Sequence, residues 1–196
     1  MQSSKIFFFA LCFLLLAVAG CRKRSDLPST SDAKLDVCAL IKNDEIQAVQ
    51  GSPITDTKSS EQSDGTLRVT QCYFSTAELN RSVSLAVRHK ASASSDKSGP
   101  RDFWKGMFGQ YTSEQKDDKE KRESLGEQSG EREKHTPPTK VEGVGEEAYW
   151  VGDRVGGALY ALKKDFVLRL SLGGPDTNEA KIEKSKTLAQ KALDRL

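Results

Sequence analysis

Three short strands in residues 148–172 constrain the fold of this chain more than any other sequence feature. In the last strand, apolar side chains occupy every second position: Phe166, Leu168, Leu170 and Leu172. Alternate side chains of a strand point to the same face, so this pattern predicts a strand with one buried face. Tight turns at 152–154 and 163–165 join the three strands, which favours antiparallel pairing.

Hydrophobic periodicity predicts further strands and three helices. The predicted strands cover 66–75 and 81–89, with a weaker one at Ile54–Lys58, and the predicted helices cover 35–51, 101–111 and 176–196. In the strand at 66–75, Leu67, Val69 and Tyr73 share one parity, which predicts its apolar face. The helix at 101–111 carries a broad apolar stripe, which is more often a core face than a ligand surface.

These elements predict an α+β fold, in which helices pack on one face of an antiparallel β-sheet. The order of helix, strands, helix, strands and helix also suggests a twofold pseudo-repeat. We assign a single domain to 35–196, with a charged, mobile insertion at about 112–140. From 112 to 135, fourteen of twenty-four residues are charged and only Leu125 is apolar, so this stretch lacks a core-facing side. Either a solvated helical extension or a disordered loop fits that composition.

The first twenty residues have the pattern of an export signal. Lys5 precedes an apolar run, Ile6–Ala19, which is short for a membrane-spanning helix. The run ends at Val18-Ala19-Gly20-Cys21, which resembles the lipobox of bacterial lipoproteins. In that family the cysteine thiol is acylated before the signal is cleaved. The resemblance implies a signal peptide at 1–20 and a membrane anchor of acyl chains, such as palmitate, on Cys21. The alternatives are a plain signal anchor and cleavage at another site.

Residues 21–34 are polar and are predicted to form a flexible tether between the anchor and the domain. In two-membrane bacteria, the lipoprotein resemblance implies retention at the inner membrane when Asp follows the lipidated cysteine. Arg22 occupies that position here. The expected localisation is therefore the bacterial cell envelope, at the outer membrane facing the periplasm if the cell has two membranes.

Export also bears on the remaining cysteines. Cys12 leaves with the signal and Cys21 carries the lipid, so Cys38 and Cys72 remain in a compartment that permits disulfides. An even pair of cysteines in that compartment favours one disulfide. Two free buried thiols, in a reducing niche, are the alternative.

The mature domain also resembles a loose group of uncharacterised bacterial envelope lipoproteins. The matching residues are Cys38-Ala39-Leu40-Ile41, Gly51, Cys72-Tyr73 and the run from Gly143 to Trp150. One departure is Lys42, where the group usually has a Thr or Ser helix cap. The resemblance covers about 36–172 without the insertion. It implies no activity, because the group has no shared established activity.

Candidate catalytic and metal-binding groups are few. His89 ends a strand and is expected to be a strand-edge or hydrogen-bonded histidine, while His135 lies in the charged insertion. Glu146 and Glu147 are adjacent on an extended segment, so their side chains point to opposite faces. Gly156-Gly157 lacks the strand–glycine–helix context of a phosphate site and indicates a bulge or a close backbone approach. We predict no catalytic, cofactor-binding or metal-binding set.

The predicted function is that of a non-enzymatic, lipid-anchored envelope protein that binds a protein partner or a small ligand. The 30 Lys and Arg residues nearly balance the 28 Asp and Glu residues, which argues against a nucleic-acid partner. Tyr149, Trp150 and Tyr160 are the candidate contact aromatics, with core packing as the alternative. A second hypothesis is a structural subunit of an envelope complex, and a third is a hydrolase with an unrecognised site. A pocket converging on His89 would favour the hydrolase, and an exposed aromatic patch would favour the first two.

Overall fold

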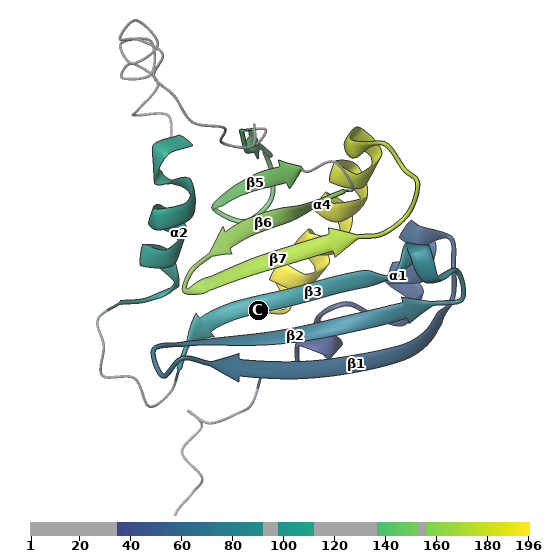
Figure 1. The fold of residues 1–196 in the computed structure, drawn as a ribbon, viewed down its shortest axis with the longest axis horizontal. Coiled ribbons are helices and arrows are strands. Elements are labelled where there is room, and N and C mark those ends of the chain that lie inside the picture. Colours follow the sequence, from purple (N-terminus) through teal and green to yellow (C-terminus); the bar gives the residue numbers. More distant parts are fainter. Residues whose placement is uncertain (1–34, 92–97, 112–136, 153–155) are drawn as a thin grey trace, which may run out of the picture. The chain divides into compact units, whose positions relative to one another are not determined.

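The part of the chain that the structure describes forms one antiparallel sheet of seven strands, in the order β1-β2-β3-β7-β6-β5-β4 (Figure 1). The strands are β1 (Ile54–Ser63), β2 (Leu67–Thr76), β3 (Val83–Lys90), β4 (Thr139–Lys140), β5 (Glu147–Gly152), β6 (Gly157–Lys163) and β7 (Phe166–Leu172). The α-helices are α1 (Asn43–Gln50), α2 (Pro100–Phe108) and α4 (Asn178–Asp194). Short 3-10 helices are η2 (Val37–Leu40), η3 (Leu79–Arg81) and η4 (Gly109–Tyr111). The predicted α+β fold with an antiparallel sheet is confirmed.

This computed structural model describes residues 35–91, 98–111, 137–152 and 156–196. The predicted signal peptide at 1–20, the lipidation site Cys21 and the tether at 21–34 lie outside the described residues. Most of the predicted insertion, including His135, also lies outside them. The described end of the insertion contains β4, which pairs with β5.

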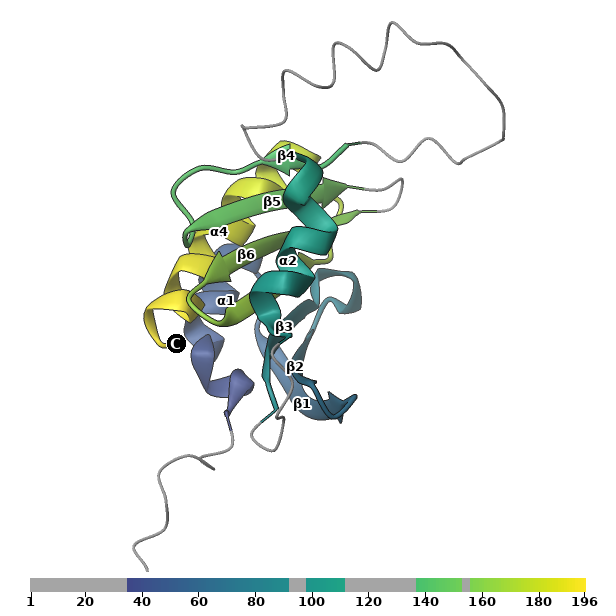
Figure 2. The same ribbon diagram turned by 90° about the vertical axis from the view of Figure 1, so that its left-hand side faces the viewer.

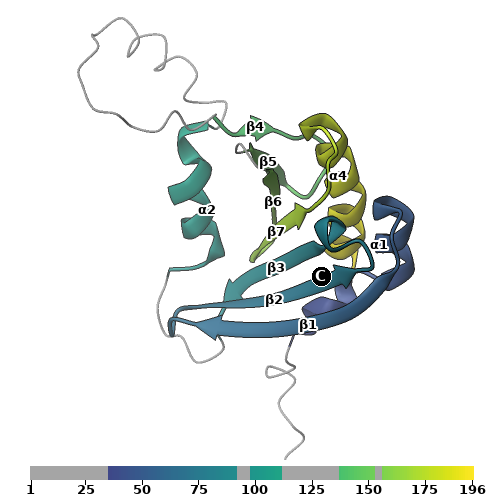
Figure 3. The ribbon, with the colours of Figure 1, turned by 45° about the vertical axis from the view of Figure 1, so that its right-hand side comes forward.

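Six of the seven strands form two three-stranded meanders, β1–β3 and β5–β7, whose third strands β3 and β7 pair with each other, and β4 is added at the edge beside β5. This arrangement gives the strands the symmetry that the predicted pseudo-repeat requires. The helices before the two meanders do not follow it, because α1 and α2 lie on opposite faces of the sheet (Figure 3). The repeat is therefore limited to the strands.

β1 is longer than the sequence pattern indicates. It pairs with β2 from Ile54↔Thr76 to Ser63↔Arg68, although nearly all of its side chains are exposed. Backbone hydrogen bonds to β2 hold this edge strand, and neither of its faces needs an apolar pattern. Hydrophobic periodicity alone therefore detected only its first half.

The main core lies between the sheet and the pair α1 and α4. β3 and β7 contribute every second side chain to it, and Leu85, Leu168 and Leu170 are fully buried. From α4, Leu188, Ala189, Ala192 and Leu193 pack against them. These positions recur at helical spacing, and the two alanines allow close approach of the helix to the sheet. The predicted strand at 166–172 and its buried parity agree with this packing.

The opposite face of the sheet carries α2. Figure 2 shows α2 in front of β5 and β6 and α4 behind them. Trp104 and Phe108 of α2 pack against Tyr149, Leu162 and Val167. Thus the helices are divided between the two faces, and α2 is the one that departs from the expected arrangement. Its apolar stripe forms a second, smaller core. The stripe is therefore a core face and not a ligand surface.

A disulfide joins Cys38 of η2 to Cys72 of β2, with 5.2 Å between their Cα atoms.

The segment predicted as one or two helical pieces at 35–51 consists of η2 and α1. Asp36 caps η2 by accepting a hydrogen bond from the Cys38 backbone N–H. At α1 the Glu45 carboxylate accepts the Lys42 N–H, as the Glu of a capping box does, while Lys42 provides no side-chain cap for the first turn. No described helix is long and apolar enough to span a bilayer.

Candidate functional site

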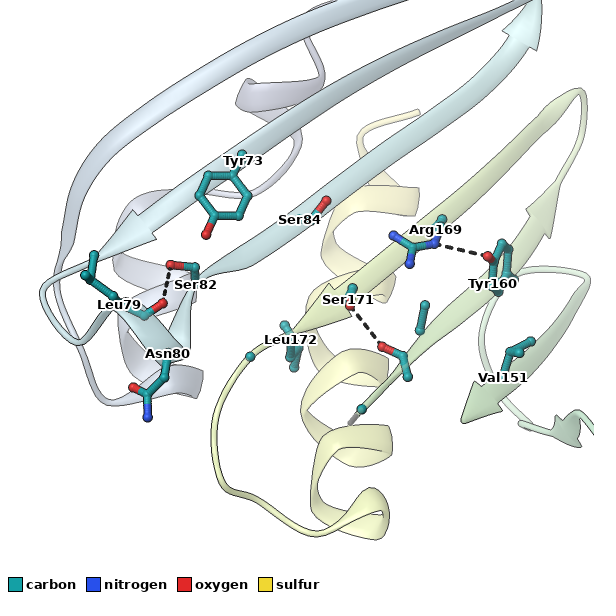
Figure 4. A pocket seen from close by; sticks show the side chains of 14 residues that line it. Tyr73, Leu79, Asn80, Ser82, Ser84, Val151, Tyr160, Arg169, Ser171 and Leu172 are labelled. Atoms are coloured by element: carbon teal, nitrogen blue, oxygen red, sulfur yellow. Dashed lines mark hydrogen bonds between the residues drawn. The ribbon is translucent and has the colours of Figure 1, made fainter. Parts of the chain in front are cut away.

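Two large hydrophobic side chains are exposed in the described part of the chain, and both line the same groove. Tyr73 is 41% exposed and Leu79 is 79% exposed. The groove has a volume of about 460 Å³. It lies on the face of the sheet that carries α2, and none of its lining residues, which Figure 4 shows, belongs to that helix. Tyr73 belongs to β2 and Leu79 to η3, so the two residues reach the groove from neighbouring elements.

Small residues on the central strands create the hollow. Those that line it are Ser84, Gly157, Ala158 and Ser171. The register places Ser84 directly opposite Ser171 across the β3–β7 pair. Facing side chains of this size do not fill the space above the sheet, whereas the larger Tyr73 and Val151 stand on either side of it. The hollow is therefore a product of pairing between residues that are far apart in the sequence.

The polar groups of the groove are mostly satisfied within the protein. Ser171 Oγ donates to the Gly157 carbonyl at 2.9 Å. Ser84 Oγ accepts a hydrogen bond of 3.0 Å from Gln71 Nε2. Arg169 is the one charged residue of the lining, and its Nε donates to the Tyr160 hydroxyl at 3.0 Å. This arrangement offers a partly apolar hollow with a single fixed cation.

The structure corrects the expectation for two of the three candidate contact aromatics. Tyr149 is 2% exposed and Trp150 is 3% exposed, because α2 covers the first and the main core encloses the second. Tyr149 and Trp150 therefore pack in the core, which is the alternative stated for these aromatic residues. Tyr160 is half-buried and lines the groove, so it is the one member of the set that can contact a ligand.

Sequence patterning missed Tyr73, Leu79 and Arg169. The strand at 66–75 was assigned the wrong apolar face, because the structure buries the parity of Cys72 and Phe74 instead. Tyr73 has the opposite parity and therefore projects into the groove. The signal for the buried face of this strand was Cys72. Its disulfide partner Cys38 lies in η2 on the core side of the sheet, so Cys72 faces the core and the adjacent Tyr73 faces away from it.

Groups considered for catalysis do not converge on the groove. His89 shares the parity of the core residues of β3, and its Nδ1 lies 3.1 Å from the Lys90 carbonyl oxygen. Burial lowers the pKa of His89. Glu146 accepts hydrogen bonds from Arg101 and from the Lys164 backbone N–H, which hold the pKa of Glu146 below its usual range.

Glu147 has a separate partner, since its carboxylate accepts the Trp104 Nε1–H at 2.8 Å. Within the described ranges, no group of three His, Cys, Asp or Glu side chains is arranged to hold a metal ion. Gly157 fits the predicted close approach, because a Cβ at this position would collide with the Trp150 ring. Gly157 thus has a packing role.

Comparison with known proteins gives little similarity. No family model matches the chain, and no curated protein matches it. Among solved structures, the fold is similar to that of a GTP binding regulator from Thermotoga maritima. The two chains share 10% sequence identity with a TM-score of 0.37, over 76% of this chain and 88% of the other. Similarity at this level supports no inference about function.

Proposed function

We propose that this chain is a non-enzymatic, lipid-anchored protein of the bacterial cell envelope that binds a small ligand in the groove of its sheet. The observation that carries the proposal is the placement of Tyr73 and Leu79. Both exposed large hydrophobic side chains of the described residues line one hollow, and Tyr160 lines it as well. Exposed apolar groups that gather in one place mark interaction sites more often than scattered ones do.

The size of the groove favours a small molecule over a protein surface. Its volume of about 460 Å³ lies within the range of small-molecule sites, roughly 300–1,000 Å³. Such sites combine mostly apolar walls with a few fixed polar groups. The groove matches this description in part: Tyr73, Leu79 and Val151 are its apolar contacts and Arg169 and Tyr160 its fixed polar ones, while serine, asparagine and backbone groups make its remaining lining polar.

Support for the anchor comes from the sequence. The junction Val18-Ala19-Gly20-Cys21 resembles a lipobox, and a polar tether at 21–34 follows it. At least two acyl chains are needed for stable attachment to a bilayer, and lipoprotein maturation supplies them. Anchored in this way, the domain would sample ligands on one side of a membrane. The Arg22 position favours the outer membrane where a second membrane exists.

The proposal is tested by capturing small molecules on the full-length lipoprotein in neutral lipid nanodiscs. The protein is incubated with a bacterial metabolite extract, washed, and analysed by mass spectrometry. A Ser84→Trp variant fills the groove, because Ser84 lines it. Ser60→Trp is the matched control, since Ser60 is an exposed residue of β1 outside the groove lining.

We expect at least one compound to be retained by the wild-type protein and by Ser60→Trp, and to be lost from Ser84→Trp. Thermal unfolding of both variants establishes that they are folded. Equal retention of every compound by the two tryptophan variants would show that the groove is not the binding site.

A further inference from the structure

We propose that the ligand of the groove is a carboxylate with an apolar body, bound at its charged end by Arg169 with Arg88 beside it. This inference rests on the proposed function and specifies its ligand class. The apolar end of the ligand would contact Tyr73 and Leu79.

Arg169 is a half-buried cation without an acidic partner. Its Nε donates to the Tyr160 hydroxyl, and the two terminal nitrogens of the guanidinium form no hydrogen bond with a described residue. No Asp or Glu is among the described residues that line the groove, and Arg169 forms no ion pair with any of the described residues. Desolvated charges in proteins are normally paired. An incoming carboxylate would supply the missing partner, in the bidentate geometry that guanidinium groups prefer.

A second arginine lies on the same face of the neighbouring strand. Arg169 of β7 is opposite Ala86 of β3, and Arg88 follows two residues later along β3. The Arg88 guanidinium stacks over the Phe103 ring of α2, 3.7 Å from its centroid, and it also forms no ion pair among the described residues. Burial lowers the pKa of Arg88, while Tyr160 and the Asp64 carboxylate oppose that effect.

Both arginines thus contact aromatic rings, and neither forms an ion pair with another described residue. They are diagonal neighbours across the β3–β7 pair, and an anion bound beside both would reduce the repulsion between their charges. Tyr160 fixes the position of Arg169, because its hydroxyl accepts a hydrogen bond from Arg169 Nε. The charge of the site is thus arranged for an anion before any ligand arrives, although the whole chain carries a net charge of only +2.

The apolar side chains determine what else the ligand needs. Tyr73 and Leu79 lie toward one side of the groove, and Arg169 lies across the small residues Ser84 and Ser171 from them (Figure 4). An inorganic anion would leave Tyr73 and Leu79 exposed, and a neutral apolar compound would leave Arg169 unpaired. A phosphate ester is less well matched, since phosphate sites commonly add a helix N-terminus, and strands and a 3-10 turn form this lining.

The test compares acids with their neutral amides on the full-length lipoprotein in phosphatidylcholine nanodiscs. The probes are 4-phenylbutyrate, octanoate and indole-3-acetate, each paired with its primary amide, and affinity is measured by calorimetry with empty nanodiscs as the blank. Charge-assisted hydrogen bonds are about twice as strong as neutral ones, so at least one acid should bind about tenfold or more tightly than its amide.

Substitutions of single arginines test which of them causes the preference for the acid over its amide. Arg169→Gln should weaken binding of that acid about tenfold and leave its amide unchanged, and Arg169→Lys should retain part of the preference. Arg88→Gln should reduce the acid preference by a smaller factor. Arg101→Gln is the control, because Arg101 is an exposed arginine of α2 that pairs with Glu146 away from the groove lining. Thermal unfolding confirms that each variant is folded.

The outcomes separate this inference from the proposed function. Binding of acids and amides with equal affinity, abolished by Ser84→Trp, would retain the groove as a ligand site and overturn the carboxylate class. Failure of every acid to bind would also overturn the inference, while metabolite capture decides the function of the groove independently. A preference for acids that persists in Arg169→Gln would place the anion site elsewhere.

Discussion

The ring of Phe108 stacks on the ring of Tyr149, with 4.8 Å between their centroids and 8° between their planes. This contact attaches α2 to the β5–β7 half of the sheet and leaves the adjoining hollow uncovered. Tyr149 also donates a hydrogen bond to the Tyr111 carbonyl at 3.1 Å, which fixes the end of the helical segment. Phe108 also lies 5.5 Å from Tyr160, between ring centroids, and Tyr160 lines the groove, so the aromatic cluster under α2 adjoins the groove.

Loss of this contact should destabilise the domain. Phe108→Ala removes a side chain that is 1% exposed, and truncation of a buried aromatic typically costs about 3–5 kcal/mol. Chemical denaturation measures the change in the free energy of unfolding. Lys105→Ala, on the exposed side of the same helix, should change that free energy by less than about 0.5 kcal/mol. Similar effects for the two variants would contradict the assigned role of Phe108.

Gly157 should tolerate no side chain. A Cβ there would overlap the Trp150 ring, so Gly157→Ala is expected to cost about 1–3 kcal/mol through overpacking. Gly156→Ala is the matched control, because its Cβ would meet only Lys181 Nζ, at 4.0 Å. Combining Gly157→Ala with Trp150→Leu should cost less than the sum of the two single changes, which a double-mutant cycle measures. Strict additivity would show that the two residues do not interact.

The Cys38–Cys72 bond should contribute through the loop that it closes, over a sequence separation of 34 residues. Cys38→Ser and Cys72→Ser should each lower the free energy of unfolding by about 2–4 kcal/mol. The double variant should cost little more than either single variant, because both remove the same bond. A thiol assay on unfolded, non-reduced protein should detect no reactive thiol from this pair. Two reactive thiols would contradict the disulfide.

Stability should fall in acid because of Glu45. Its carboxylate accepts hydrogen bonds from Arg195 at 2.7 and 2.8 Å, and these hold the pKa of Glu45 well below its usual range, against the opposing effect of burial. A depressed pKa in the folded state stabilises the protein above the unfolded-state pKa, about 4.3, and this contribution is lost as the pH falls further.

Glu45→Gln should therefore cost about 1–3 kcal/mol at pH 7, in the range for hydrogen bonds to charged groups. The difference from the wild type should shrink progressively below about pH 4.3. Glu183→Gln is the control, because Glu183 is a mostly exposed partner of Lys186. Denaturation curves at a series of pH values test this, and a difference that is independent of pH would refute the assignment.

The anchor makes a separate prediction. Cys21→Ala removes the thiol to which the lipid would be attached, so the variant should no longer incorporate labelled palmitate or diacylglycerol. The wild-type mature protein should partition into the detergent phase, and any processed variant should stay in the aqueous phase. Partitioning of a processed Cys21→Ala protein into detergent would contradict the lipobox interpretation.

Local pattern determined the strand at 166–172, its buried parity and the helix of the second core. These features depend on side-chain periods of two and 3.6 residues, which the sequence displays directly. The same reasoning detected half of β1, because an exposed edge strand needs no apolar pattern. It also assigned the wrong face to β2, where Leu67, Val69 and Tyr73 looked like the buried set. Both parities of that strand carry apolar residues, and burial of Cys72 decided between them.

Only the tertiary structure decided where the groove lies and what lines it. Ser84 and Ser171 face each other because β3 pairs with β7, and that register depends on packing of the whole sheet. On the face that it shares with the groove, α2 packs on Tyr149 and leaves Tyr73 and Arg169 to line the groove. The apolar stripe of a helix specifies which side of the helix is buried. Long-range contacts decide which surface of the protein covers that side.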